Sequence, residues 1–347
     1  MSDLVIVLIC LISLFRGYKF KVSNLFIICV FSLLFSLSFF KLPGIFIGTL
    51  YLIRLVTYFV FSQIVYRQFG TKEKKRKLIF DSLILVGIFI AIFGWIQYFI
   101  FPDLRALKAF QWDDHYFRLV STFLDPAFTG ILLVLAEILI FIKTVKSETR
   151  LNYFLNIFLI TTVLFTYSRA SYLALLFAFV FLFIKFRRKF LLILIILFLL
   201  LVPLLPKQTG GEGVNLTRTY SIFGRIENYR ESLILISKSP VFGIGFDNVC
   251  VAKNKFLGEG NFVSHSCSGL DNSILFIFAT TGIIGLIIFT HSISRIVNKT
   301  TQDLYGVALI ASFVAIFVHG MFTNTFFYNF VLGWIAILIG ITRKVKD

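Results

Sequence analysis

Long blocks of apolar residues constrain this chain more than any other feature of its sequence. Two of them are Val22–Phe40 and Leu191–Leu205, which are apolar on every face of a helix rather than on one. A helix needs about 20 mostly apolar residues to cross the hydrocarbon core of a bilayer. Backbone groups must be paired there, so only helices and closed barrels span it, and barrel strands alternate apolar with polar residues. These blocks do not alternate, so the sequence predicts an all-α, polytopic bundle of transmembrane helices.

The composition agrees with this class. Hydrophobic residues make up 58% of the 347 residues and charged residues 15%. An ordinary soluble domain is about 45–50% apolar and about 25% charged. A soluble globular domain is therefore disfavoured.

We expect about ten or eleven spans. The first block, Leu4–Phe15, is short for a span and lacks the basic start and cleavage site of a signal peptide. The predicted spans divide the chain into transmembrane helices 1–8 within residues 1–206, a long loop at 207–272, and helices 9–11 within 273–347. The predicted spans lie at 3–15, 22–40, 43–66, 79–101, 119–142, 151–167, 170–184, 190–206, 273–290, 304–322 and 326–342.

The net charge of +17 is concentrated in the short linkers between these blocks. If the C-terminus is cytoplasmic, the linkers on that side carry 21 Lys and Arg residues and the short opposite linkers carry five. Short cytoplasmic loops are enriched in Lys and Arg, whereas long loops escape this rule. We therefore expect a cytoplasmic C-terminus and a long loop on the periplasmic or extracellular side. This distribution argues against a nucleic-acid-binding face.

The long loop contains a predicted amphipathic helix over about residues 222–239. Pro240 ends it, and Gly243–Gly245 forms a tight bend. Such a helix can lie along the membrane surface. Its apolar positions recur at helical spacing: Ile226, Tyr229, Leu233 and Ile236.

Arg169 is the first candidate functional residue, because ionisable groups at membrane depth are costly. It lies in Thr166–Ser171, which interrupts an apolar run over 151–184 that is too long for one crossing. The chain must therefore fold back near Arg169. The residue is either part of an ordinary polar turn or a guanidinium whose planar fork binds a phosphate.

Arg118 is the second candidate. Asp125–Pro126 follows it, and a proline there is expected to break the span and free backbone groups to line a cavity. The alternative is a snorkelling arginine at the interface before a kinked helix. Arg54 and Glu137 lie within predicted spans, where they could pair with each other.

The loop adds further candidates. Arg225 and Arg230 lie on the amphipathic helix. His265, Asp271 and Asn272 precede the next span, and a His or Asp there could act as a general base for a hydroxyl, although a lone loop histidine is more often inert. The four cysteines contain no CxxC pair and no metal spacing. The pairing of Cys250 with Cys267 in a disulfide stays open.

Four stretches together resemble the O-antigen ligase and Wzy polymerase superfamily of membrane glycosyltransferases. They cover about residues 115–290. In the ligases a histidine stands where this chain has Asp271. The four stretches are Arg118–Pro126, Tyr167–Ala170, the arginine helix from Phe223 with Ser239–Gly245, and Asp271–Leu275 with Gly282–Gly285.

The resemblance implies a GT-C-like helical bundle with a large extracytoplasmic loop. It also implies an enzyme that transfers an undecaprenyl-diphosphate-linked glycan to an acceptor hydroxyl, without a cofactor or a metal. Arginines stabilise the negative charge of a diphosphate leaving group, a role for Arg118, Arg169 and Arg225, with Arg230 in reserve. The base would be Asp271 or His265, with Asn272 beside the acceptor.

Within this superfamily the aspartate favours a polymerase of O-antigen or another surface polysaccharide over a ligase that attaches glycan to lipid A core. A lipid-linked oligosaccharide flippase is the competitor from another class, but transporters tend to show inverted repeats and none is evident. A structural partner in an export complex is a further alternative. We expect the bacterial inner membrane as the location, membrane lipids around the chain, and a chain-length regulator and a flippase as partners.

Overall fold

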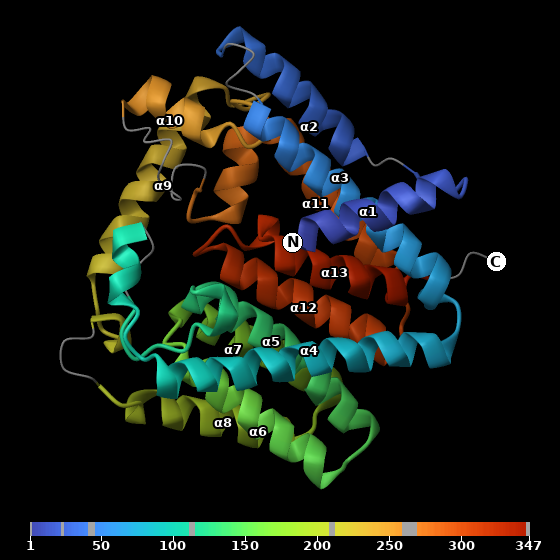
Figure 1. Cartoon of the computed structure of the whole chain (residues 1–347), viewed down its shortest axis with the longest axis vertical. Coiled ribbons are helices and arrows are strands. Elements are labelled where there is room, and N and C mark those ends of the chain that lie inside the picture. The colour runs from blue at the N-terminus through green and yellow to red at the C-terminus, as the bar shows by residue number, and fades with distance from the viewer. Residues whose placement is uncertain are drawn as a thin grey trace. The chain divides into compact units, whose positions relative to one another are not determined.

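The computed structural model describes residues 2–21, 24–40, 46–110, 115–207, 212–258 and 269–344. Its secondary structure in these ranges is helical, apart from two isolated β-bridges. Figure 1 shows the helices in chain order. The longer helices are α1 (Ser2–Phe15), α2 (Asn24–Phe35), α3 (Phe46–Val65), α4 (Glu73–Ile100), α5 (Pro126–Lys146), α6 (Arg150–Phe165), α7 (Arg169–Phe186), α8 (Lys189–Leu201), α9 (Tyr220–Lys238), α10 (Val249–Leu257), α11 (Ser273–Asn298), α12 (Leu304–Gly320) and α13 (Asn329–Thr342).

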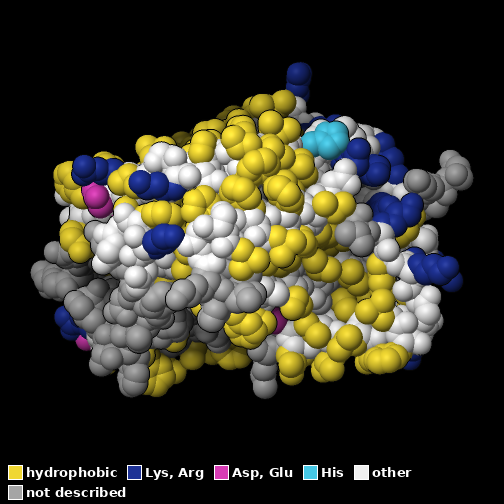
Figure 2. Space-filling model, turned by 90° about the horizontal axis from the view of Figure 1, so that it is seen from above, with side chains coloured by type: hydrophobic (Ala, Val, Ile, Leu, Met, Phe, Trp, Pro, Cys, Tyr) yellow, Lys and Arg dark blue, Asp and Glu magenta, His cyan; other side chains and the backbone are white. Residues whose placement is uncertain are grey.

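The apolar helices fall where the sequence predicts spans. In the described part of the chain, five helices are long and apolar enough to cross a membrane, and six more are apolar but shorter. Each of these eleven overlaps one predicted span. Large apolar side chains are exposed along them, as on α4, where Leu85, Phe89 and Phe93 are about half exposed, and hydrophobic side chains cover much of the face in Figure 2. The chain is an all-helical, polytopic membrane protein, as predicted.

The first helix is short. α1 has 14 residues, which gives a length of about 21 Å, less than the roughly 30 Å of the hydrocarbon core. Asp3 on α1 forms an ion pair with Arg54 on α3, in which Oδ2 of Asp3 lies 2.7 Å from Nη2 of Arg54. The suggested pairing of Arg54 with Glu137 is therefore wrong. Glu137 is fully buried on α5, and neither of its carboxyl oxygens has a hydrogen-bond partner within the described residues.

The chain forms two compact units, each drawn from separate parts of the sequence. The first unit comprises residues 1–73, 221–301 and 320–347, and the second comprises 74–220 and 302–319. In the first unit, α3 packs against α1, α2 and α13, and α2 packs against α11. In the second unit, α5 packs against α6 and α7, and α8 packs against both α6 and α7.

α5 begins later than predicted, for a local reason. Asp125 is its N-cap, and the carboxylate accepts hydrogen bonds from the backbone N–H groups of Ala127 and Phe128 at 2.7 and 2.8 Å. Pro126 occupies the first helical position, where no N–H is needed. Asp125–Pro126 therefore starts the helix rather than breaking a span that begins at residue 119. The preceding chain is irregular, with left-handed backbone at Leu124.

The predicted amphipathic helix is present as α9, and it ends before Pro240 as expected. Its buried face differs from the prediction. Ile236 is buried as expected, together with Leu235, whereas Ile226 and Leu233 are more than half exposed. The predicted apolar stripe therefore lies mostly on the outside of the first unit, which suits a helix that lies along a membrane surface.

The bend after α9 locks onto a kink in α11. Ile244 N–H and Gly245 N–H donate to the carbonyls of Ala279 and Thr280 at 2.9 and 3.1 Å, and Ile283 N–H donates to the carbonyl of Pro240 at 2.9 Å. Gly282 has left-handed backbone (φ 67°) inside α11. A Cβ there would lie 2.1 Å from the carbonyl oxygen of Val241. Only glycine permits both this conformation and this approach.

We predict that Gly282→Ala destabilises the protein by more than about 1 kcal/mol, because alanine is strained at this φ and collides with backbone. Thermal unfolding in detergent measures the effect. Gly224→Ala on α9 is the control, because nothing lies within 4 Å of the added Cβ and the change favours helix. Equal unfolding temperatures for Gly282→Ala and the wild type would contradict this account of the kink.

Candidate functional site

Arg118 lies in the second unit and binds the carbonyl end of α6. Its Nε donates to the carbonyl of Thr166 at 3.1 Å and its Nη2 to that of Tyr167 at 3.3 Å. The residue is 9% exposed. A Cβ on Gly213 would lie 2.7 Å from Cδ of Arg118, so glycine allows the loop to close over the arginine. Arg118 is held by protein rather than snorkelling into solvent.

Two further arginines surround the same turn. Nη1 of Arg169 donates to the carbonyls of Leu216 and Arg218 at 3.3 and 3.1 Å. Arg218 donates through Nη1 to the carbonyl of Gly213 at 2.6 Å and through Nη2 to that of Tyr167 at 3.4 Å. Arg118 and Arg218 thus share the Tyr167 carbonyl. We call Arg118, Arg169 and Arg218 the arginine cluster.

The fold-back predicted near Arg169 creates this cluster. α6 ends at Phe165 and α7 begins at Arg169. Between them Tyr167 has left-handed backbone (φ 51°), and Ser168 caps α7 by accepting from the N–H of Ser171 at 3.3 Å. Arg169 is therefore the first residue of a helix, where the helix dipole is also positive. A cation at that position is favourable when an anion binds there.

A buried hydroxyl–histidine chain lies behind the turn. The Ser171 hydroxyl donates to Ser168 Oγ at 2.8 Å and lies 3.2 Å from Nε2 of His319 on α12. Ser171 and His319 are fully buried. These contacts between Ser168, Ser171 and His319 connect the N-terminus of α7 to α12 within the second unit, and they hold the first turn of α7 in position.

The remaining predicted residues belong to the first unit. Arg225 Nε donates to the carbonyl of Phe322 at 3.2 Å, and its guanidinium lies 5.8 Å from the Phe322 ring centroid. Beside it, the Tyr229 hydroxyl and the Asn272 amide both donate to the carbonyl of Met321. Arg225 on α9 and the start of α11 therefore meet at the same short segment.

Asp271 is fixed through its backbone. Its N–H donates to Oδ1 of Asn228 on α9 at 2.7 Å. Asn272 is buried and caps α11, because its Oδ1 accepts from the N–H groups of Ile274 and Leu275 at 2.8 and 3.1 Å. Asn272 is thus a helix cap that orients Asp271. We call Arg225, Asn228, Tyr229, Asp271 and Asn272 the Asp271 group.

The members of the Asp271 group act on the pKa of Tyr229. Burial raises the pKa of Tyr229, the Asn272 hydrogen bond and the Arg225 charge act to lower it, and the Asp271 carboxylate adds to the rise. A second acid in the first unit, Asp247, is buried just before α10, and burial raises its pKa well above the usual value. The pattern of the sequence did not single out Asp247.

The other residues predicted from the sequence do not join these two groups of side chains in the described part of the structure. Arg230 has a side chain that is 75% exposed and lies 3.9 Å from Glu227, so it faces away from the Asp271 group. His265 and Cys267 lie outside the described residues. Within the described ranges no group of three His, Cys, Asp or Glu residues could hold a metal ion. Arg218 and His319 were missed, since neither lies in a motif that distinguishes it from an ordinary loop or span residue.

The arrangement defines a class: a polytopic helical membrane protein with guanidinium groups at the break between two helices and a carboxylate at the start of a third. A comparison with known families finds a match over part of the chain. Residues 154–290 match the family model described as O-antigen ligase (Wzy_C), so the chain carries an O-antigen ligase family domain, in agreement with the resemblance to the O-antigen ligase and Wzy superfamily. No curated protein matches the chain. The domain supports a function of the O-antigen ligase or polymerase type.

We predict that inorganic diphosphate raises the unfolding temperature of the purified protein, because a ligand of the folded state stabilises it by mass action. Arg118→Gln and Arg218→Gln should each reduce this rise, and added salt should weaken it. Arg105→Gln is the matched control in the same unit, since Arg105 is exposed and pairs with Asp103 at 2.6 Å. No diphosphate effect in the wild type, or an equal effect in all variants, would contradict an anion site.

Proposed function

We propose that this protein is a Wzy-type polymerase of O-antigen or another surface polysaccharide. It transfers a glycan from undecaprenyl diphosphate to an acceptor hydroxyl on another lipid-linked repeat unit. The observation that carries this proposal is the arginine cluster, in which three guanidinium groups gather at the break between α6 and α7. The family domain over residues 154–290 supports the reaction class.

The reaction breaks the bond between the anomeric carbon of the donor sugar and the diphosphate oxygen. The acceptor oxygen forms the new bond to that carbon, its proton goes to a base, and undecaprenyl diphosphate leaves with the bonding electrons. Negative charge therefore develops on the diphosphate. Preorganised donors that stabilise such charge usually supply the largest share of catalysis.

The arginine cluster suits the leaving group. Hydrogen bonds from each member of the cluster run to backbone carbonyls, and these bonds orient the guanidinium groups. Arginine presents a planar fork that matches phosphate oxygens. The position of Arg169 at the start of α7 adds the positive end of a helix. Charge and geometry both favour a diphosphate.

Asp271 suits the base. Its backbone is fixed by Asn228 and by the neighbouring cap Asn272, so the carboxylate has a defined location at the start of α11. Arg225 lies in the same group and supplies a cation for the charged substrate. Asn272 acts as a positioning residue, because its side chain is used by the cap.

Polymerisation is favoured over ligation because an aspartate stands where the ligases of the superfamily carry a histidine. A ligase would need lipid A core as the acceptor, and a flippase would move the lipid-linked glycan without changing its length. The charge distribution supports a bacterial inner-membrane protein with a cytoplasmic C-terminus and the 207–272 loop on the periplasmic or extracellular side. A chain-length regulator and a flippase are the proposed partners.

The test uses the purified protein and one undecaprenyl-diphosphate-linked repeat unit as both donor and acceptor. We expect products of two and more units from the wild type. Arg169→Ala should lower the rate by about 10²–10³-fold through lost charge stabilisation, and Asp271→Asn by about 10²–10⁴-fold through loss of the base.

Two controls make the result specific. Asp103→Asn and Arg105→Gln remove an exposed pair and should leave the rate unchanged. His265→Ala separates the two candidate bases. Full activity in Asp271→Asn together with loss in His265→Ala would move the base to His265. Wild-type product lengths in Arg169→Ala would remove the proposed anion site. In a parallel reaction with lipid A core added as a second acceptor, transfer only to that core would identify a ligase.

A further inference from the structure

The first unit contains a short segment, residues 321–325, which follows the end of α12 in the chain. Three side chains of the Asp271 group donate hydrogen bonds to the carbonyls of Met321 and Phe322. The Ser273 hydroxyl, in the first turn of α11, donates to the carbonyl of Thr323 at 3.2 Å. α9 and the start of α11 therefore hold the backbone of this segment in one place.

Asn324 in this segment carries an amide that the neighbouring backbone does not use. It occupies the N-cap position of a 3₁₀-helix, Thr325–Phe327, where an asparagine side chain usually accepts a backbone hydrogen bond. Asn324 makes no such bond, and its Oδ1 is buried without a hydrogen-bond partner among the described residues. Folded proteins leave few buried acceptors unpaired, because each one costs free energy. A donor from a ligand would recover this cost.

The hydroxyl groups on either side of Asn324 bond to each other. Oγ1 of Thr323 and Oγ1 of Thr325 lie 2.9 Å apart in a hydrogen bond, and the N–H of Thr325 donates to the carbonyl of Thr323 at 2.8 Å. Asn324 is only partly buried, and the terminal torsion of an asparagine side chain varies over a broad range. A rotation of the amide therefore turns either polar atom towards the surface while the backbone stays fixed.

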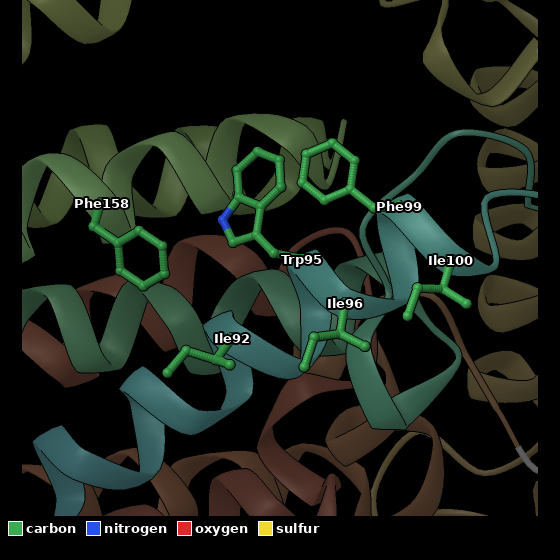
Figure 3. Close-up of a pocket in the computed structure, with 6 residues that line it drawn as sticks. All are labelled: Ile92, Trp95, Ile96, Phe99, Ile100 and Phe158. Carbon is green, nitrogen blue, oxygen red and sulfur yellow. The ribbon is translucent and has the colours of Figure 1, made fainter.

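The apolar pocket of the second unit offers no comparable group. It lies between α4 and α6, has a volume of about 610 Å³, and is lined by Ile92, Trp95, Ile96, Phe99, Ile100 and Phe158 (Figure 3). The one polar atom of these side chains, Nε1 of Trp95, donates to Oγ1 of Thr162 at 3.0 Å. A sugar would find no hydrogen-bonding side chain in that pocket.

We propose that Asn324 binds a hydroxyl group of the acceptor sugar and so helps to select the acceptor. The inference rests on the proposed function and deepens it. An amide both donates and accepts hydrogen bonds, as a sugar hydroxyl does, and it carries no charge, whereas arginine is the better match for a phosphate.

The location of the segment suits an acceptor. Asn272 and Ser273, which bond to it, directly follow the candidate base Asp271. The reacting hydroxyl has to come within hydrogen-bond reach of the base. A segment fixed next to Asp271 is therefore suited to hold the sugar that carries this hydroxyl.

The test separates acceptor from donor. The acceptor is the repeat unit as its octyl glycoside, which cannot donate a glycan, and the donor is the undecaprenyl-diphosphate-linked unit with its own acceptor hydroxyl methylated. Asn324→Ala should raise KM for the octyl glycoside about tenfold, equivalent to about 1.4 kcal/mol, with the donor KM unchanged. Asn298→Ala is the matched control in the first unit, because Asn298 is exposed at the opposite end of α11. An unchanged acceptor KM in Asn324→Ala would overturn the proposal.

Deoxy analogues of the acceptor distinguish a direct contact from an effect on the fold. Each analogue lacks one hydroxyl group of the terminal sugar. One of them should show a KM about tenfold higher with the wild type, and Asn324→Ala should raise that KM no further, because the same hydrogen bond is already lost. Additive increases for every analogue would overturn the proposal.

Two measurements without turnover separate this inference from the polymerase. The unfolding temperature of ligand-free Asn324→Ala should stay close to that of the wild type, because Oδ1 has no hydrogen bond to lose within the described residues; a clear fall would overturn the sugar site. Calorimetry without donor should show binding of the octyl glycoside that weakens about tenfold in Asn324→Ala, and equal binding would also overturn it. Weakened binding, with a wild type that joins no repeat units, would retain the sugar site and reject the polymerase.

Discussion

The hydrogen bonds that close the carbonyl end of α6 are the interaction on which the candidate site depends. The last carbonyls of a helix have no partner within it, and at membrane depth water is not available to replace one. Here the Phe165 carbonyl accepts from the N–H of Leu119 at 2.9 Å, and the next two carbonyls accept from Arg118. Cations are favourable at this end of a helix. The need to pair carbonyls thus places guanidinium groups at the point where α7 begins.

A second constraint organises the first unit. The bend after α9 exchanges backbone hydrogen bonds with the kink of α11, and both elements need glycine at the contact, at Gly243 and Gly282. A Cβ on Gly243 would lie 2.3 Å from the carbonyl carbon of Thr280. Ser239–Gly245 and Gly282–Gly285, which belong to the third and fourth of the stretches that resemble the family, therefore pack together as one structural element. This lock joins α9, which carries Arg225, to α11, which begins beside Asp271.

Much of the fold was predictable because its signal is local. Each apolar block becomes a helix since the bilayer allows few alternatives, and the polar interruption at 166–171 marks the turn between α6 and α7. Asp125–Pro126 was misread because the same pair can interrupt a helix or start one, and the capping geometry decides between these outcomes. The exposed face of α9 depends on which helices pack against it, which its own spacing does not encode.

The candidate site was predictable in part. Arg118, Arg169, Arg225 and Asp271 stood out through the resemblance or through their cost in a membrane. Arg218 did not, because a loop arginine becomes significant only when the chain folds back on Tyr167. His319 was hidden because a single histidine at the end of an apolar block resembles a core residue, and its contact with Ser171 joins positions 148 residues apart. Arg225 and Arg230 look alike in sequence, and only their contacts distinguish them.

The most direct measurement of the central claim is the glycan ladder of cells with and without the gene. If the protein is a polymerase, its deletion should reduce the ladder to a single repeat unit on the carrier or on the core, and the restored gene should rebuild the full ladder. Full-length chains that accumulate on undecaprenyl diphosphate, with none attached to the core, would contradict the account and identify a ligase.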